Sequence, residues 1–327
     1  MRSTLSWILA SLVAAPALAQ SPYPNTENFG ISFDREADWY KECMRVEHVR
    51  PPAGPSTSAP AACDASGAYY ARLDQAITSA AEWTQVRSCA IAGNDTAVLA
   101  MLYANGLGVK RNLALATHYA CSTGAALAET ESRVMHLSTL PEGKRFDQCD
   151  DITSGRMGGV CAAIDATRAE KVRTAFLARV RRTLPAQHTA AFDRLVGTSA
   201  AFASSHASDE TPPGGSGYTG FVIAAEAREH EWLREHLAAF EKRRFDLPPP
   251  SQFAVDDAEL NRIYGDLLKS NRTEGDIHVS AIRAAQRHWL AYRDAWVAFA
   301  ALRYPQVPAD SLKAALTQWR IKQLRRL

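Results

Sequence analysis

Several patterns that identify common protein classes are missing from this chain of 327 residues. After residue 19, no stretch stays apolar for the roughly eighteen residues that a membrane-spanning helix needs, so we expect no membrane span. Alternating patterns typical of β-strands are scarce, and no glycine-rich phosphate loop follows a strand. The chain also lacks an excess of charge, with 37 basic and 35 acidic side chains, which gives no reason to expect nucleic acid.

Signatures of catalysis and of metal binding are missing as well. His230 and His236 are six residues apart, which turns them about 120° away from each other on a helix, unlike the i, i+4 pair of zinc proteases. Ser216 lacks the second glycine of a nucleophile elbow, and no two cysteines have C-x-x-C spacing. We therefore predict no catalytic residues, no cofactor and no metal. Two distant carboxylates that meet in a cleft, as in a cell-wall enzyme, stay open as an alternative.

The cysteines and the first residues of the chain predict an exported protein. Residues 1–19 combine Arg2, an apolar run and an Ala-Leu-Ala end, which is typical of a secretory signal peptide. An even number of cysteines behind such a leader indicates disulfides and a periplasmic or secreted, soluble protein. Six cysteines allow fifteen pairings. Pairing of neighbours is favoured because it closes short loops: Cys43 with Cys63, Cys89 with Cys121, and Cys149 with Cys161.

The remaining chain has helical patterns throughout, so we predict an all-α fold. Proline and glycine clusters divide it into a disulfide-containing helical domain over 20–165, a helical middle region over 166–247 and a last domain over 251–327. Leu247 and the three prolines that follow it form the spacer before the last domain.

Residues 93–124 have the pattern of a helix pair. Gly106 and Gly108 suit a left-handed turn between two antiparallel helices, and Asn112 suits the N-cap of the second. The stretch resembles a Sel-one-like repeat, a relative of the tetratricopeptide helix pair. The other matching residues are Ala97, Leu102, Tyr103, Val109, Ala116, Tyr119 and Gly124. This resemblance implies either a concave surface that binds another protein or a helical scaffold, and both stay open.

The most regular apolar pattern in the chain runs over 281–305. Its apolar residues are spaced by three and four, which keeps them on one side of a helix: Ile282, Ala285, Trp289, Tyr292, Trp296 and Phe299. Arg293 flanks this seam and Asp294 points away from it. A helix before it and another after Pro308 complete a predicted three-helix domain that can share one core.

The order LNxxY, QRxWLxYRDA and LTxxRxxxL resembles the LprI-type lysozyme inhibitor family of exported bacterial proteins. The matching residues are Leu260, Asn261, Tyr264, Gln286, Arg287, Trp289, Tyr292, Arg293, Asp294, Leu316, Thr317, Arg320 and Leu324. The resemblance covers the last quarter of the chain and implies a helical domain. Family members often carry two cysteines near the places where this chain has Trp296 and Ala314 or Ala315, so it departs from the family there.

The resemblance implies a protein that binds lysozyme or another peptidoglycan hydrolase and covers its cleft, as an immunity protein would. Residues 256–276 are rich in acids, which predicts either a solvated face or a surface for a cationic partner. Tyr292, Arg293, Asp294 and Arg320 are the candidate protein-binding residues. The alternatives are a core position for Tyr292 and, for the charged residues, an ion pair between helices, for example Asp294 or Asp266 with Arg320.

The other matching residues are assigned to the core and the family signature: Leu260, Asn261, Tyr264, Gln286, Trp289, Trp296, Thr317 and Leu324. The hydroxyl of Thr317 is expected to bond to the preceding helical turn. Two other functions stay open beside inhibition, namely an envelope scaffold that binds through the helical repeat and an enzyme that acts on the cell wall.

Overall fold

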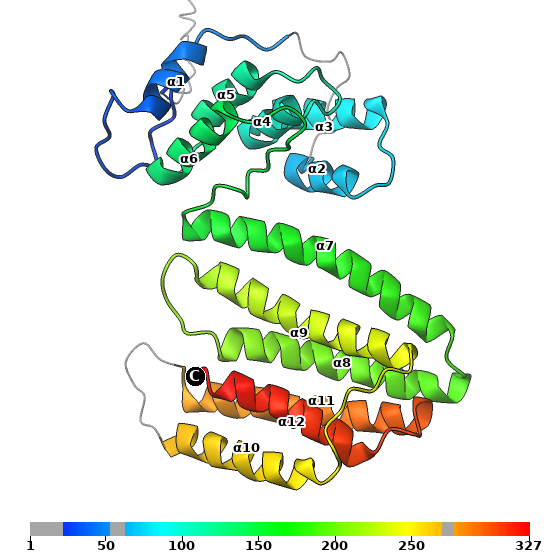
Figure 1. Ribbon diagram of the computed structural model, residues 1–327. Coiled ribbons are helices and arrows are strands. Elements are labelled where there is room, and N and C mark those ends of the chain that lie inside the picture. Colours follow the sequence, from blue (N-terminus) through cyan, green and yellow to red (C-terminus); the bar gives the residue numbers. More distant parts are fainter. Residues whose placement is uncertain (1–21, 53–62, 270–276) are drawn as a thin grey trace, which may run out of the picture.

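The computed structural model describes residues 22–52, 63–269 and 277–327, which form twelve α-helices and no strand (Figure 1). The predicted all-α fold is therefore confirmed for these residues. The predicted signal peptide lies outside them. None of the helices in the described ranges is both long enough and apolar enough to cross a membrane.

Six short helices form the front unit of the molecule. They are α1 (Asp38–Val46), α2 (Ala65–Leu73), α3 (Ala80–Ala92), α4 (Thr96–Asn105), α5 (Leu113–Ser122) and α6 (Leu127–Ser138). Their side chains share one apolar core that extends from Phe29 to Phe146. Helix α4 lies at the centre, because residues 98–104 are all buried and a helix that is apolar all round needs neighbours on every side.

The predicted helix pair is formed by α4 and α5. Gly106 ends α4 with a φ of +67°, in the left-handed region, and Gly108 has a φ of +66° where it packs against Trp83. The side chain of Asn112 caps α5 by accepting a hydrogen bond from the Leu115 N–H at 3.0 Å. These three local predictions are confirmed. Membership of this pair in the Sel-one-like family stays a prediction.

Three disulfides join the front unit to itself and to the helix that follows. They connect Cys43 with Cys121, Cys63 with Cys89, and Cys149 with Cys161. The neighbour pairing predicted for the first four cysteines is wrong, and the pairing of the last two is confirmed. Helix α1 packs against α5 and α6. Its cysteine therefore meets a residue 78 positions away, since spatial proximity and not loop length decides the pairing.

Six longer helices form the back unit. They are α7 (Gly155–Arg182), α8 (Ala186–Asp209), α9 (Tyr218–Glu241), α10 (Gln252–Lys269), α11 (Val279–Arg303) and α12 (Ala309–Leu324). In Figure 1, α7 lies on α9, and α8 lies between α9 and the last three helices.

The three predicted C-terminal helices are present, and all six residues of the predicted seam on α11 are buried. Their core is larger than a three-helix domain, because α11 packs most extensively against α8. One apolar cluster runs from Val180 to Leu324 and includes side chains of the middle region. A separate domain beginning at residue 251 stays a prediction.

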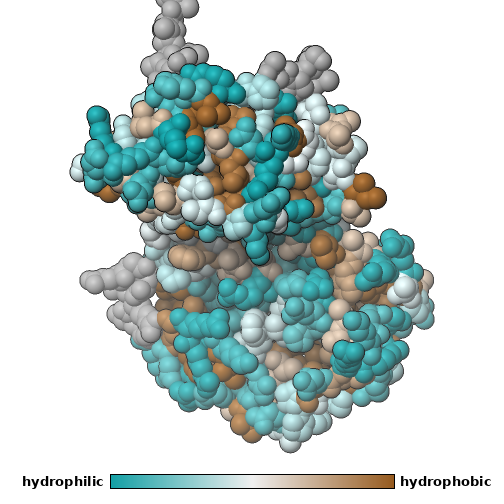
Figure 2. Space-filling view, turned by 45° about the horizontal axis from the view of Figure 1, so that its top comes forward, coloured by the Kyte–Doolittle hydropathy of each residue, from teal (hydrophilic) through white to brown (hydrophobic). Residues whose placement is uncertain are grey.

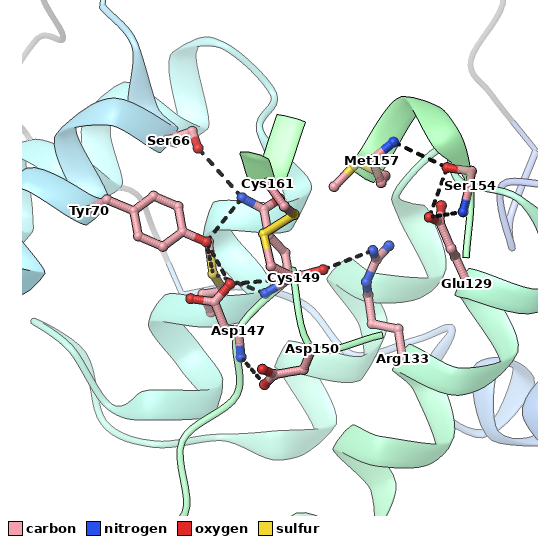
Figure 3. Close-up of a disulfide and its surroundings, with 12 residues drawn as sticks. Ser66, Tyr70, Glu129, Arg133, Asp147, Cys149, Asp150, Ser154, Met157 and Cys161 are labelled. Atoms are coloured by element: carbon pink, nitrogen blue, oxygen red, sulfur yellow. Dashed lines mark hydrogen bonds between the residues drawn. A yellow bond between two sulfur atoms is a disulfide. The ribbon is translucent and has the colours of Figure 1, made fainter. Parts of the chain in front are cut away.

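A buried carboxylate attaches α7 to the front unit (Figure 3). Glu129 accepts hydrogen bonds from the Thr153 N–H at 3.0 Å, the Ser154 N–H at 2.9 Å and the Ser154 hydroxyl at 2.8 Å. Burial raises the pKa of Glu129, but the hydrogen bonds from Ser154 and Thr153 outweigh it and hold that pKa below its usual range. Ser154 also caps α7, so one carboxylate fixes the position at which this helix begins.

Glycines let the start of α7 approach the start of α9 and the turn before it. A β-carbon on Gly155 would lie 2.2 Å from the backbone carbon of Ser216, and one on Gly220 would lie 3.2 Å from the backbone of Gly158. By contrast, a β-carbon on Gly158 would have no atom within 4 Å. Within α7, Gly155 is therefore needed for the close approach, whereas Gly158 has space for a β-carbon.

Replacing Gly155 by alanine is expected to lower the free energy of unfolding by about 1–3 kcal/mol, because the new methyl group must displace backbone atoms. Gly158→Ala in the same helix is the matched control, and it should be neutral or stabilise by up to about 1 kcal/mol. Urea denaturation of both variants measures the difference. Equal effects of the two substitutions would contradict the close approach.

Candidate functional site

The C-terminal polar residues lie in two places, a buried network and an exposed face. The network is centred on Arg320 of α12, which is 0% exposed. Its two terminal nitrogens donate to the carboxylate of Glu210 at 2.7 and 2.5 Å, and its Nε donates to Gln286 at 2.9 Å. Gln323 also accepts from Arg320, at 3.2 Å. The guanidinium group is therefore satisfied within the protein.

The predicted ion-pair partners of Arg320 are wrong. Asp294 bonds to Arg293, and Asp266 bonds to Arg262. Glu210 takes the place of both because α8 ends beside α12 in the core, whereas Asp294 and Asp266 point to solvent.

A second buried carboxylate, that of Glu229 on α9, completes the network. It accepts hydrogen bonds from Trp319 Nε1 at 3.1 Å and from Gln323 Nε2 at 2.8 Å. His206 stands between the two carboxylates, with Nδ1 at 2.7 Å from Glu210 and Nε2 at 3.7 Å from Glu229. The network thus connects four helices, α8, α9, α11 and α12.

The two carboxylates differ in their electrostatics. Burial raises the pKa of Glu210, but hydrogen bonds from Arg320 and His206 outweigh it and hold that pKa below its usual range. Burial also raises the pKa of Glu229, and there it dominates over the attraction of His206. The reason is chemical, since the hydrogen-bond donors to Glu229 are the neutral groups of Trp319 and Gln323.

Two carboxylates and an imidazole are groups that can act in acid–base catalysis, but a substrate cannot reach these three side chains. The side chain of Glu210 is 0% exposed, that of Glu229 is 4% exposed and that of His206 is 14% exposed. Hydrolysis of a glycan requires contact between the carboxylates and the scissile bond. The network instead fixes how the four helices pack.

Four residues of this network were not predicted from the sequence: Glu210, Glu229, His206 and Gln323. A signal for Glu229 was present, because it lies on the buried seam of α9 with Leu233, Leu237 and Phe240. A charged residue on an apolar seam indicates a buried partner. Glu210 follows the last turn of α8 and carries no comparable local signal.

Two of the predicted protein-binding residues are buried. Tyr292 is 2% exposed and its ring stacks on Phe202 with centroids 5.8 Å apart, and Arg320 is 0% exposed. This burial agrees with the alternative of a core position for Tyr292 and of an ion pair between helices for Arg320, and it leaves neither side chain accessible to a partner in this fold. The expected bond of Thr317 is absent: its hydroxyl is buried and has no hydrogen-bond partner among the described residues.

Of the other two predicted residues, Asp294 is exposed, whereas the side chain of Arg293 is only 15% exposed and lies where α11 meets α10. Arg293 places its guanidinium 5.2 Å from the centre of the Trp289 ring and 3.8 Å from a carboxylate oxygen of Asp257. Asp294 is 64% exposed and accepts from Arg293 at 3.1 Å. Asn261, one turn from Asp257, donates to it at 3.1 Å.

Leu290 lies on the same side of α11 as Arg293 and Asp294 and is 38% exposed. We call this surface the α10–α11 face. Its residues are Asp257, Asn261, Leu290, Arg293 and Asp294.

The acidic side chains of α10 do not form a free negative surface. Asp256 accepts from Gln252 and Gln318 at 2.9 Å each. Hydrogen bonds from Arg262 and Arg325 hold the pKa of the exposed Glu259 at about 2. Arginines also pair with Asp257 and Asp266, and these pairs reduce the negative charge that this helix presents to a cationic protein.

The remaining signature residues mostly belong to the core, as predicted. Leu260, Gln286, Trp289, Trp296 and Leu324 are all buried. Tyr264 is half-buried and packs at the edge of the same core, whereas Asn261 is exposed. The family signature therefore consists of a packed interior and a small polar surface.

Residues 251–324 match the model of a family described as lysozyme inhibitor LprI. The match confirms the resemblance and covers α10, α11 and α12. No curated protein and no solved structure shows significant similarity to the chain. Glu210 and Glu229, which hold the buried network together, lie outside the matched residues.

Arg320→Ala is expected to lower the free energy of unfolding by about 3–5 kcal/mol, because it leaves the buried charge of Glu210 without its partner. The double variant Arg320→Met with Glu210→Leu removes both charges and should recover most of this loss. Chemical denaturation of the single and double variants gives the coupling energy. A double variant that is as unstable as the single one would show that the ion pair does not account for the loss.

Replacing Glu210 and replacing Glu229 are expected to change the pH dependence of the free energy of unfolding in opposite directions. Because the pKa of Glu210 is lowered in the folded protein, its ionised form stabilises the fold above the ordinary carboxyl pKa, and this stability is lost as pH falls. Compared with the unaltered protein, Glu210→Gln should therefore become less stable as pH rises. Because the pKa of Glu229 is raised in the folded protein, its protonated form stabilises the fold at low pH, and this stability is lost as pH rises. Compared with the unaltered protein, Glu229→Gln should therefore become more stable as pH rises. Urea denaturation between about pH 3 and pH 8 measures both slopes, and slopes of the same sign would contradict the assignment.

Proposed function

We propose that this protein binds and inhibits lysozyme or a related peptidoglycan hydrolase, as the match of residues 251–324 to the lysozyme inhibitor family implies. The single observation that carries the proposal is this match, together with the packing of the matched helices. Inhibition by binding requires no cofactor and no chemical step.

The α10–α11 face is the proposed contact surface. On this face, Asn261 and Asp294 are exposed, the side chain of Arg293 is 15% exposed, and Leu290 is 38% exposed; Arg287, one turn before Leu290, is exposed as well. An arginine beside an apolar side chain is a combination favoured at the energetic centres of protein interfaces. Arg293 is also held in place by Trp289 and Asp257.

The proposed mechanism is occlusion of the glycan cleft by this face. The helices beneath it are fixed by the buried seam of α11 and by the Arg320 network, so the face is ordered before it meets a partner. A surface that is already ordered loses little conformational entropy on binding, which favours affinity. The scissile bond of the glycan is then excluded by the bulk of the inhibitor.

The disulfides and the matched family are consistent with an exported protein. We propose that it acts in the periplasm or outside the cell, where peptidoglycan hydrolases meet their substrate. The lysozyme of a host or the hydrolase of a competing bacterium is the proposed target.

The proposal is tested with the oxidised chain that begins at Gln20, added to lysozyme in a cell-wall clearing assay. We expect slower clearing in the presence of the protein. Arg293→Ala should weaken inhibition by about tenfold, or roughly 1.4 kcal/mol, while the melting temperature changes by no more than a few degrees. Arg181→Ala is the matched control, because Arg181 is also paired with an aspartate but lies on α7, outside the matched residues.

Several results would contradict this function. Unchanged clearing at a large excess of the protein would instead favour an envelope scaffold that binds through the front unit. Clearing of cell walls by the protein alone would favour an enzyme. A matched loss of inhibition and of stability in Arg293→Ala would make this arginine a structural residue.

A further inference from the structure

A cavity of about 360 Å³ lies between α2 of the front unit and α7. Gly67, Tyr70 and Ala71 line it on the α2 side, and Val160, Ala163 and Ile164 line it on the α7 side. The molecular surface narrows between the two units, and apolar residues are exposed there among hydrophilic ones (Figure 2). The cavity is outside residues 251–324, so the match to the inhibitor family does not account for it.

The walls of this cavity are held in place by polar contacts and a disulfide (Figure 3). The hydroxyl of Tyr70 donates to Asp147 at 2.6 Å, and the amide of Gln148 contacts Tyr70 and Ser66 at 3.5 Å each. The next residue, Cys149, is bonded to Cys161 of α7. Both walls therefore have a fixed separation, which is what a preformed binding site requires.

An ion pair closes one end of the cavity. Arg168 of α7 donates to Asp74 from Nε at 3.1 Å and from Nη2 at 2.7 Å. Its guanidinium also lies 5.8 Å from the centre of the Tyr70 ring. The charge of Asp74 is thereby neutralised, so it does not repel an anion at this end.

Lys171 supplies a second positive charge at the same end. It lines this cavity and an adjoining one of about 570 Å³, and it forms no ion pair with any of the described residues. The other carboxylate in the lining, Asp64, lies at the opposite end of α2, where it accepts a hydrogen bond from the Gly67 N–H at 2.9 Å as the N-cap and keeps its negative charge. The cavity thus has apolar walls, with the Arg168–Asp74 ion pair and Lys171 at one end and Asp64 at the other.

We propose that this cavity binds a small amphipathic carboxylate, with its aliphatic chain or aromatic ring between α2 and α7 and its carboxylate at Lys171. Ligand sites are typically roughly 300–1,000 Å³, mostly apolar, and found where two structural units meet. The size of this cavity suits a single chain or ring. This proposal is independent of inhibitor activity, because it concerns different residues.

Isothermal titration calorimetry of the oxidised protein with octanoate tests the proposal, with octylammonium as the probe of opposite charge. Octanoate should bind with one-to-one stoichiometry and octylammonium at least about tenfold more weakly. Lys171→Gln should weaken octanoate binding by about tenfold, and Ala163→Trp should abolish it by filling the space.

Matched controls separate binding from folding. Lys322→Gln and Ala258→Trp place the same substitutions at exposed positions on other helices, and both should bind octanoate like the unaltered protein. Equal affinity for octanoate and octylammonium, or unchanged binding by Ala163→Trp, would overturn the proposal. Absence of binding for both octanoate and 4-phenylbutyrate at millimolar concentration would overturn it as well. Lysozyme inhibition by Ala163→Trp should be unaltered, which distinguishes this proposal from the function proposed above.

Discussion

The buried ion pair between Arg320 and Glu210 is the interaction on which the packing of the back unit depends. A charged pair removed from water is stable only when its geometry is good and its remaining donors are satisfied, and here Gln286 and Gln323 satisfy them. Glu210 comes from the end of α8, whereas Arg320 comes from α12. The last three helices are therefore held to the middle region by polar specificity as well as by apolar contact, and their exposed face has a defined orientation.

The two units of the molecule use different means to achieve order. The back unit has long helices around an aromatic seam and a polar network. Its one cysteine, Cys161, lies at the junction with the front unit. The front unit consists of short helices, which bury less apolar surface each, and two disulfides join them internally. Helix α7 connects the units through Glu129 and Cys161, and this connection also forms the cavity beside α2.

Much of the local structure follows from residue patterns that act over one or two helical turns. The seam of α11, the left-handed turn at Gly106 and the cap at Asn112 are such features, because each depends on neighbours in the chain. The candidate site was predicted only in part. Asp294 is exposed and Arg293 keeps 15% of its side chain exposed, but Tyr292 and Arg320 are covered by α8 and α9, helices outside the family signature.

The amino-acid sequence by itself determined the all-helical class, the resemblance of the last helices to the inhibitor family and the presence of disulfides in the first half of the chain. Helical periodicity, turn residues and residue identity are local properties, so they can be read without coordinates. Only the tertiary structure decided the pairing of Cys43 with Cys121, the choice of Glu210 as partner of Arg320 and the cavity between α2 and α7. Each of these joins residues far apart in the chain, and their proximity results from the packing of whole helices.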